Sequence, residues 1–259
     1  MIILYSEVIK GILIPFLGTS IGSAAVFIMK NELKRSVHRA LTGFAAGVMT
    51  AASVWSLLLP AIEKSAYLKN LSFIPAVVGF WAGVLFLVII DKLTPLIYSE
   101  NPASLRSSQT SRLVFAVTLH NIPEGMAIGV AYAACLADKS QVSTAGAFAL
   151  ALGIAIQNFP EGAIVSMPIH ANGKTKLKSF ICGALSGAVE PIASVITIIF
   201  AGLFTAVLPY ALSFAAGAMI YVVIRELVPE GERGNPSYIS SVFFALGFTV
   251  MMSLDVALG

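Results

Sequence analysis

Charged residues are scarce in this chain of 259 amino acids, because Lys, Arg, Asp and Glu together make up only 11% of it. Soluble domains carry about 25% charged residues, which keep their surfaces hydrated. Hydrophobic residues make up 58% of the sequence instead. This composition excludes an ordinary water-soluble globular protein and indicates a polytopic membrane protein.

Cysteine is also rare, and the two examples are Cys135 and Cys182. Both lie within or at the end of apolar stretches, where a free thiol usually packs as a small hydrophobic side chain, so we expect no disulfide. The sequence also lacks a glycine-rich loop of phosphate-binding spacing and a basic patch interleaved with aromatic residues. We therefore expect no nucleic-acid partner, and an ATP-driven machine would need another chain.

Long apolar runs fill most of the chain, and a helix needs about 20 such residues to cross a hydrocarbon core of about 30 Å. Eight candidate spans lie near residues 5–29, 39–62, 71–91, 111–136, 142–169, 178–204, 208–229 and 236–257. Pro209 is the expected break in an uncharged stretch that is too long for one span. We predict an all-α membrane protein with a single transmembrane domain over residues 1–259, whose first span is retained and not cleaved as a signal peptide.

The positive charges predict the orientation, because Lys and Arg accumulate on cytoplasmic loops. If the N-terminus lies outside, twelve of the 16 basic residues fall on inside-facing connections and four on outside-facing ones. The four are Lys10, Lys64, Lys69 and Lys139. This distribution predicts eight spans in the inner cell membrane with both termini outside the cytoplasm.

One six-residue pattern occurs twice inside apolar stretches. The first hexad, HNIPEG, occupies residues 120–125, and the second, QNFPEG, occupies residues 157–162. A carboxylate within a membrane span costs about 2.5 kcal/mol or more, so Glu124 and Glu161 need a compensating partner. A bound cation is the obvious one.

The spacing within each hexad favours ligation. Residues four apart share a helix face, which places His120 beside Glu124 and Gln157 beside Glu161. Each hexad also contains a proline, which leaves the carbonyl four residues upstream without its helical partner and opens the helix toward an ion. Asn121 and Asn158 add amides, and the set contains no thiolate, which suits an ion that must leave again.

The two hexads fall on the fourth and fifth of the eight spans, with three spans on each side. Consecutive spans run antiparallel, so the copies face each other as the centre of an inverted repeat would. We therefore predict a 3+2+3 arrangement with a site near the bilayer midplane. Two shared carboxylates can bridge two divalent ions, which makes a two-position site between helices 4 and 5 the preferred interpretation.

Other polar residues extend this set. Glu190, next to a proline in the sixth span, is a candidate third carboxylate, while Met49 is on chemical grounds more often core than ligand. Asp91 and Glu226 lie near the inner ends of their spans and are either solvated end charges or part of an exit path. The remaining side chains near span ends are interpreted as solvated or interfacial groups: His38, His170, Glu230, Glu232 and Asp255.

At these residues the chain resembles the ZIP family of divalent-metal transporters, and most of all its GufA-type bacterial branch. The similarity covers nearly the whole chain and rests on the two hexads, SGAVEP at 186–191, AAGAMIY at 215–221 and ELVPE at 226–230. The resemblance implies eight helices with external termini. It implies a first ion held by His120, Glu124, Gln157 and Glu161, with Met49 approaching from the second span. It implies a second ion held by Asn121, Asn158, Glu124, Glu161 and Glu190.

The chain departs from the family pattern at three places. Residues 91–112 contain no histidine, whereas the family usually has a His-rich segment there. Arg225 stands where a Glu or His is expected, and the second hexad begins with Gln157 in place of the common His. These departures bear on metal preference and on cytoplasmic capture.

We predict transport of a divalent cation into the cytoplasm, zinc first, with cadmium, iron and manganese as further candidates. The metal is cargo, and we expect neither an enzymatic activity nor a prosthetic group. A metal-selective channel, an intramembrane metalloenzyme and a metal sensor remain alternatives, since a channel would not saturate and a sensor would bind without flux. The expected partners are the metal ions and the lipid bilayer, and glycine pairs such as Gly43 with Gly47 permit a homodimer without requiring one.

Overall fold

The computed structural model describes residues 2–28, 34–97, 105–137, 144–203, 207–233 and 237–258. These ranges are helical throughout, apart from short turns, and contain no strand. The helices in chain order are α1 (Ile2–Ser23), α2 (Ala25–Ile28), α3 (Arg35–Ala52), η1 (Ser53–Leu58), α4 (Leu59–Lys64), η2 (Ala66–Leu71), α5 (Phe73–Ile97), α6 (Leu105–Ala137), α7 (Thr144–Ala171), α8 (Lys176–Gly187), α9 (Val189–Leu203), α10 (Leu208–Val222), η5 (Val223–Leu227), α11 (Val228–Glu232) and α12 (Ile239–Leu258).

Several of these helices follow one another to form long apolar segments. Seven segments of the described residues are long and apolar enough to cross a membrane: Ser6–Ile28, Arg35–Lys64, Phe73–Leu93, Thr144–Ala171, Lys176–Phe200, Leu208–Glu232 and Ile239–Ala257. In addition, α6 is a helix of 33 residues that contains the first hexad. The prediction of an all-α, polytopic membrane protein is confirmed.

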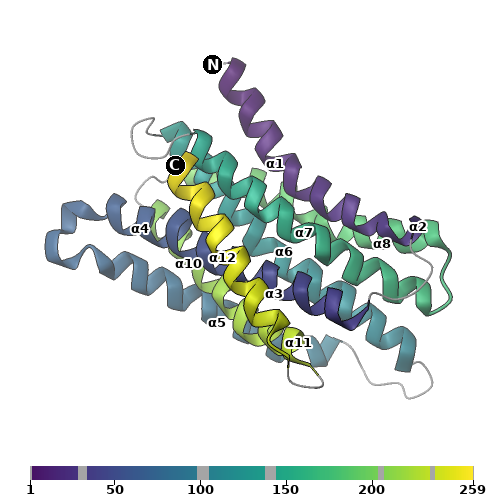
Figure 1. Cartoon of the computed structure of the whole chain (residues 1–259). Coiled ribbons are helices and arrows are strands. Elements are labelled where there is room, and N and C mark those ends of the chain that lie inside the picture. The colour runs from purple at the N-terminus through teal and green to yellow at the C-terminus, as the bar shows by residue number, and fades with distance from the viewer. Residues whose placement is uncertain are drawn as a thin grey trace.

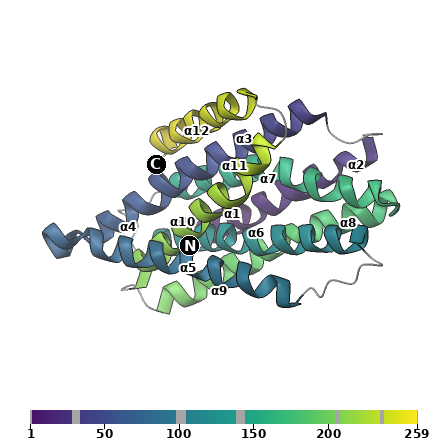
Figure 2. The ribbon, with the colours of Figure 1, turned by 90° about the horizontal axis from the view of Figure 1, so that it is seen from below.

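The segments form one elongated bundle (Figures 1 and 2). The most extensive contacts pair α3 with α12, α5 with α10, α1 with α7, and α6 with α9. The hexad helices α6 and α7 also contact each other, and the polar residues of both hexads are buried. The C-terminus and α4 lie at one end, and α2 and the start of α8 lie at the other.

Glycines set the closest of these contacts, because a helix that lacks a side chain at one point lets a neighbouring backbone approach. The contacts of α3 with α12 have counterparts in those of α10 with α5. In each case a methyl group on the glycine would collide with a backbone carbonyl of the paired helix. The four pairs are Gly47 with Phe244, Gly217 with Phe80, Gly247 with Phe44, and Gly83 with Phe214.

The helices α3 and α10 resemble each other in sequence and in form. Residues 44–49 read FAAGVM and residues 214–219 read FAAGAM. Each helix continues into a π-helical turn, η1 or η5, and then into a short helix with a proline in its first turn, Pro60 or Pro229. A proline supplies no N–H, and a wider turn before it relieves the clash with the preceding carbonyl. The two segments therefore share the same local structure, a π-helical turn followed by a proline.

Candidate metal site

The two hexads bring their polar side chains together in the interior. Asn121, Glu124, Gln157 and Asn158 are fully buried, and Glu161 is 9% exposed. Gln157 Nε2 donates a hydrogen bond of 2.6 Å to Glu124 Oε1, which joins the second hexad to the first. Both helices continue through their hexad prolines.

Glu190, at the start of α9, connects the two hexads a second time. Its carboxylate accepts hydrogen bonds from Asn121 Nδ2 at 3.2 Å and from Asn158 Nδ2 at 2.8 Å. A third donor is Thr19 Oγ1 of α1, at 3.1 Å. The side chain is fully buried, so these amides and this hydroxyl provide part of the solvation that water would otherwise supply.

Close backbone packing holds these groups in place. Gly125 lies against the backbone of Glu190, and Gly162 lies against the backbone of Thr19. The hydroxyl of Ser194 then donates to the carbonyl of Gly125 at 2.8 Å. The hydroxyl of Ser23 donates to the carbonyl of Gly162 at 3.2 Å. The final glycine of each hexad thus receives a backbone contact and a hydroxyl hydrogen bond from one neighbouring helix, which is α9 for Gly125 and α1 for Gly162.

The site gathers three carboxyl groups close together in the interior. Glu124, Glu161 and Glu190 lie close enough to repel one another. In addition, three buried oxygens have no hydrogen-bond partner among the described residues: Asn121 Oδ1, Glu124 Oε2 and Gln157 Oε1. Each such atom costs about 1–3 kcal/mol, and more when charged. All three are acceptors, so the group that would satisfy them is a cation or a proton donor.

Oxygen ligands of this kind suit a divalent ion that binds reversibly. Across the part of the chain that the structure describes, no three His, Cys, Asp or Glu side chains gather closely enough to hold an ion by themselves. The buried amides of Asn121, Gln157 and Asn158 are further oxygen donors available for coordination. A site that depends on neutral amides binds its ion less tightly than a cage of thiolates.

The other two predicted ligands of the first ion position are His120 and Met49. His120 lies on α6 one turn before Glu124, but its side chain falls outside what the structure describes. Met49 is 1% exposed on α3, within the apolar core cluster. Thr19 was missed by sequence reasoning, because a threonine in an apolar first span carries no signal of the distant carboxylate that it contacts.

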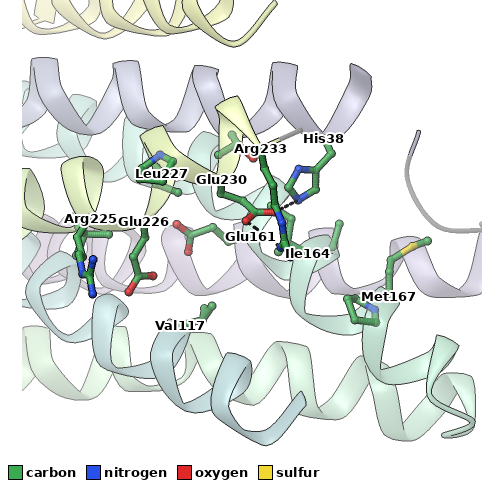
Figure 3. Close-up of a pocket in the computed structure, with 15 residues that line it drawn as sticks. His38, Val117, Glu161, Ile164, Met167, Arg225, Glu226, Leu227, Glu230 and Arg233 are labelled. Carbon is green, nitrogen blue, oxygen red and sulfur yellow. Dashed lines mark hydrogen bonds and ion pairs between the residues drawn. The ribbon is translucent and has the colours of Figure 1, made fainter. Parts of the chain in front are cut away.

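A cavity of about 750 Å³ opens beside this site (Figure 3). Glu161 lines it, together with residues of α3, α6, α10, η5 and α11. Figure 3 shows the carboxylates of Glu161, Glu226 and Glu230 turned toward the same space. Because α11 and the start of α3 form its rim, the cavity leads from the buried site to the end of the bundle where those elements lie.

The two predicted exit-path residues have different surroundings. Glu226 lines the cavity. Asp91 is not among the residues that line it, and its Oδ2 accepts a hydrogen bond of 2.6 Å from the Tyr221 hydroxyl. Arg225 Nε lies 3.8 Å from the same oxygen. The positive charge of Arg225 is therefore directed in part toward Asp91.

Sequence reasoning interpreted His38 and Glu230 as surface groups, and the structure adds that both line the cavity. A signal for Glu230 was present, because residues 229–231 read Pro-Glu-Gly, as the end of each hexad does. His38 has no such signal, since its place on the rim depends on how α3 packs against α11.

Comparison with known proteins places this geometry in context. A family model described as ZIP Zinc transporter matches residues 106–255. The chain is 36% identical to Zinc transporter ZIP11 of Xenopus tropicalis, over 98% of this chain and 99% of that protein. It is 30% identical to Zinc transporter GufA of Myxococcus xanthus, over 93% and 96% of the two chains. It is 32% identical to Zinc transporter ZIPB of Bordetella bronchiseptica, over 94% and 79%.

Proposed function

The chain belongs to the ZIP zinc transporter family, and on that basis we propose that its buried site carries zinc across the inner cell membrane into the cytoplasm. The observation that carries this proposal is the set of three buried oxygens, Asn121 Oδ1, Glu124 Oε2 and Gln157 Oε1, that lack a partner among the described residues. They lie among three mutually repelling carboxylates. A divalent cation would satisfy the oxygens and offset the repulsion at once.

The site would hold the ion in two positions that share the hexad glutamates. The first position would use the pairs of hexad residues that are four apart in sequence, His120 with Glu124 and Gln157 with Glu161. Met49 would approach this position from α3. The second would use the hexad asparagines and Glu190 with the same glutamates: Asn121, Asn158, Glu190, Glu124 and Glu161. The relatives named above are called zinc transporters, which supports zinc as the ion.

The amides would also serve the site when no ion is bound. Asn121 and Asn158 donate to Glu190, and Gln157 donates to Glu124, so each of these carboxylates has a donor before metal arrives. An arriving ion would compete with those donors, and the amides could turn their oxygens toward it. An amide that can either donate to a carboxylate or coordinate the ion would favour release of the ion as well as its binding.

We further propose that the bundle is an eight-helix 3+2+3 inverted repeat. The matched glycine contacts of α3 with α12 and of α10 with α5 support it, as do the sequence FAAG in α3 and α10 and the two π-helical turns. The matched contacts of Gly125 and Gly162 support it for the other four segments. In this arrangement α6 and α7 are the central pair.

The cavity supports alternating access with the inner side open. Its rim lies at the ends of α3 and α11, near Arg35 and Arg233, which the charge distribution assigns to the cytoplasm. An ion held by Glu161 would lie next to that cavity, because Glu161 lines it. Entry from the outside would require a second arrangement of the helices, in which the cavity closes and the opposite side opens.

Zinc flux into liposomes tests this function. The purified protein would be reconstituted, and the initial rate of zinc uptake would be measured against external zinc concentration, with protein-free liposomes as control. We expect saturable uptake, because each transport cycle requires a conformational change. A rate that rises in proportion to concentration would indicate a channel, and zinc binding without uptake would indicate a sensor.

A further inference from the structure

A separate, apolar cavity of about 430 Å³ lies against the back of the first hexad. Ile122 and Met126 of α6 line it. These two residues are four apart and share a helix face, whereas Glu124 is two residues from each and therefore points to the other side of α6. The rest of the described lining comes from α9 and the start of α10: Ala193, Ile196, Thr197, Phe200, Val207 and Ala211. The cavity is thus a neighbour of the buried polar site and not part of it.

The packing of three helices leaves this space open. Gly125 and Gly129 bring α6 against the backbone of α9, at Glu190 and Ser194. On the side toward α10, the lining residue Ala211 carries only a methyl group and does not fill the space between the helices. The side chains around an unfilled apolar cavity lose the dispersion contacts that a filling group would supply. An apolar molecule in this space would restore them.

The lining is almost free of polar groups. None of the described residues that line the cavity is charged, and the one with a polar side chain is Thr197, which is 9% exposed. A buried water needs two to four polar partners, and apolar cavities without them stay dry and take up apolar molecules. The volume lies within the range of about 300–1,000 Å³ that is usual for ligand pockets. The chemistry of the lining therefore favours an apolar ligand over water.

The cavity opens on a lipid-facing surface. Its outer lining residues Ile196, Phe200 and Val207 are 50%, 62% and 50% exposed. Ile192 and Ile199 continue this exposed apolar surface along α9. The segments Lys176–Phe200 and Leu208–Glu232, which carry α9 and α10, are both long and apolar enough to cross a membrane. The molecules that meet the opening at this depth are the acyl chains of the bilayer.

We propose that this cavity binds one acyl chain of a membrane phospholipid, which enters sideways from the bilayer between α6, α9 and α10. The methylene groups would pack on Ile122 and Met126 and support the face of α6 behind the hexad. The unbranched, flexible side chain of Met126 suits contact with an acyl chain that has no fixed shape. This lipid site goes beyond the proposed transport function and does not depend on which ion is carried.

Photolabelling of the full-length protein in phosphatidylcholine vesicles tests the site. The vesicles would contain a phosphatidylcholine with a diazirine midway along one acyl chain, and mass spectrometry would locate the adducts. We expect adducts on the inner lining residues Ile122, Met126 or Thr197, as well as on Ile199 of the lipid-facing surface. Ala211→Trp should lower the inner adducts about fivefold relative to Ile199, because the large indole would occupy the space. Ala82→Trp, on the exposed side of α5 and outside the lining, should leave them unchanged.

Adducts confined to the exposed residues, or inner adducts that persist undiminished in Ala211→Trp, would overturn the proposal. If Ala211→Trp does not fold, hydroxyl-radical oxidation of the unmutated protein in the same vesicles replaces it, because this reaction reports water beside methionine. Met126 should be as well protected as Met219, which is fully buried in the core. Oxidation of Met126 well above that of Met219 would show that water fills the cavity and would contradict the lipid site. None of these measurements involves zinc, so their failure would leave the proposed transport function untouched.

Discussion

Gln157 Nε2 donates a 2.6 Å hydrogen bond to Glu124 Oε1, so the amide that opens the second hexad is bound to the carboxylate of the first. The two residues are buried and lie on different helices, α7 and α6. The amide has two roles in this position. Its nitrogen solvates the Glu124 carboxylate, while its oxygen, Oε1, has no hydrogen-bond partner among the described residues.

Replacing this amide with a stronger zinc ligand should raise zinc affinity. Gln157→His adds an imidazole beside Glu161, and imidazole favours zinc over manganese. We expect the KM for zinc uptake to fall by about three- to tenfold, corresponding to about 0.6–1.4 kcal/mol. Competition between zinc and manganese during uptake measures the preference. Gln109→His, in the chain before the hexads, is the control, and an unchanged preference in Gln157→His would show that Gln157 does not contact the ion.

Removing the hydroxyl that reaches Glu190 should destabilise the protein without removing a ligand. Thr19→Val keeps the shape and deletes the bond from Thr19 Oγ1 to Glu190 Oε1. We expect a loss of about 1–3 kcal/mol, because a buried carboxylate loses a donor. Thermal unfolding in detergent measures it. Thr50→Val serves as control, since the Thr50 hydroxyl bonds only the carbonyl of Ala46 in its own helix in the described contacts; an equal loss there would refute the special role of Thr19.

Filling a close glycine contact should weaken the pairing of α10 with α5. Gly217→Val places a side chain against the carbonyl of Phe80, where the backbones leave no room. We expect about 1–3 kcal/mol of destabilisation from overpacking. Ala82→Val on the exposed side of α5 should change little. Thermal unfolding of both variants measures the difference. If Gly217→Val were as stable as Ala82→Val, the close glycine contact would not be required.

Removing the positive charge beside the cavity should speed zinc uptake at low salt. Arg225→Gln lowers the repulsion that a cation meets along the cavity wall and frees Asp91 from its ion pair. We expect the initial rate to rise by about two- to tenfold at low ionic strength, and by less at 1 M salt, because salt screens the effect. Lys178→Gln, an exposed position at the same end, should not change the rate. Equal rates for Arg225→Gln and the unmutated protein would contradict this electrostatic role.

The helical class followed from composition, and the residues of the hexads were visible because Glu124 and Glu161 are charges in apolar stretches. Periodicity within one helix places Gln157 beside Glu161, but it carries no information on the neighbouring helix. For that reason the hydrogen bond of Gln157 to Glu124 could not be read from the sequence. The three donors to Glu190 depend in the same way on how α1, α6 and α7 pack around α9.

The cavity was beyond sequence reasoning for a related physical reason. His38 and Glu230 are separated by most of the chain and meet only because α3 packs against α11. The π-helical turn η5, which precedes Pro229, sets the direction in which Glu226 and Glu230 point, and a π-helical turn has no reliable sequence signature. The third Pro-Glu-Gly at residues 229–231 was the one available signal.

Zinc uptake by Glu124→Ala in proteoliposomes tests the central claim most directly, because Glu124 receives the amide of the second hexad and would be shared by both ion positions. The variant would be compared with the unmutated protein and with Glu232→Ala, an exposed glutamate outside the cavity lining. Size-exclusion chromatography would show that all three are folded. We predict that uptake is abolished in Glu124→Ala and unchanged in Glu232→Ala. Uptake by folded Glu124→Ala at the normal rate would contradict the account.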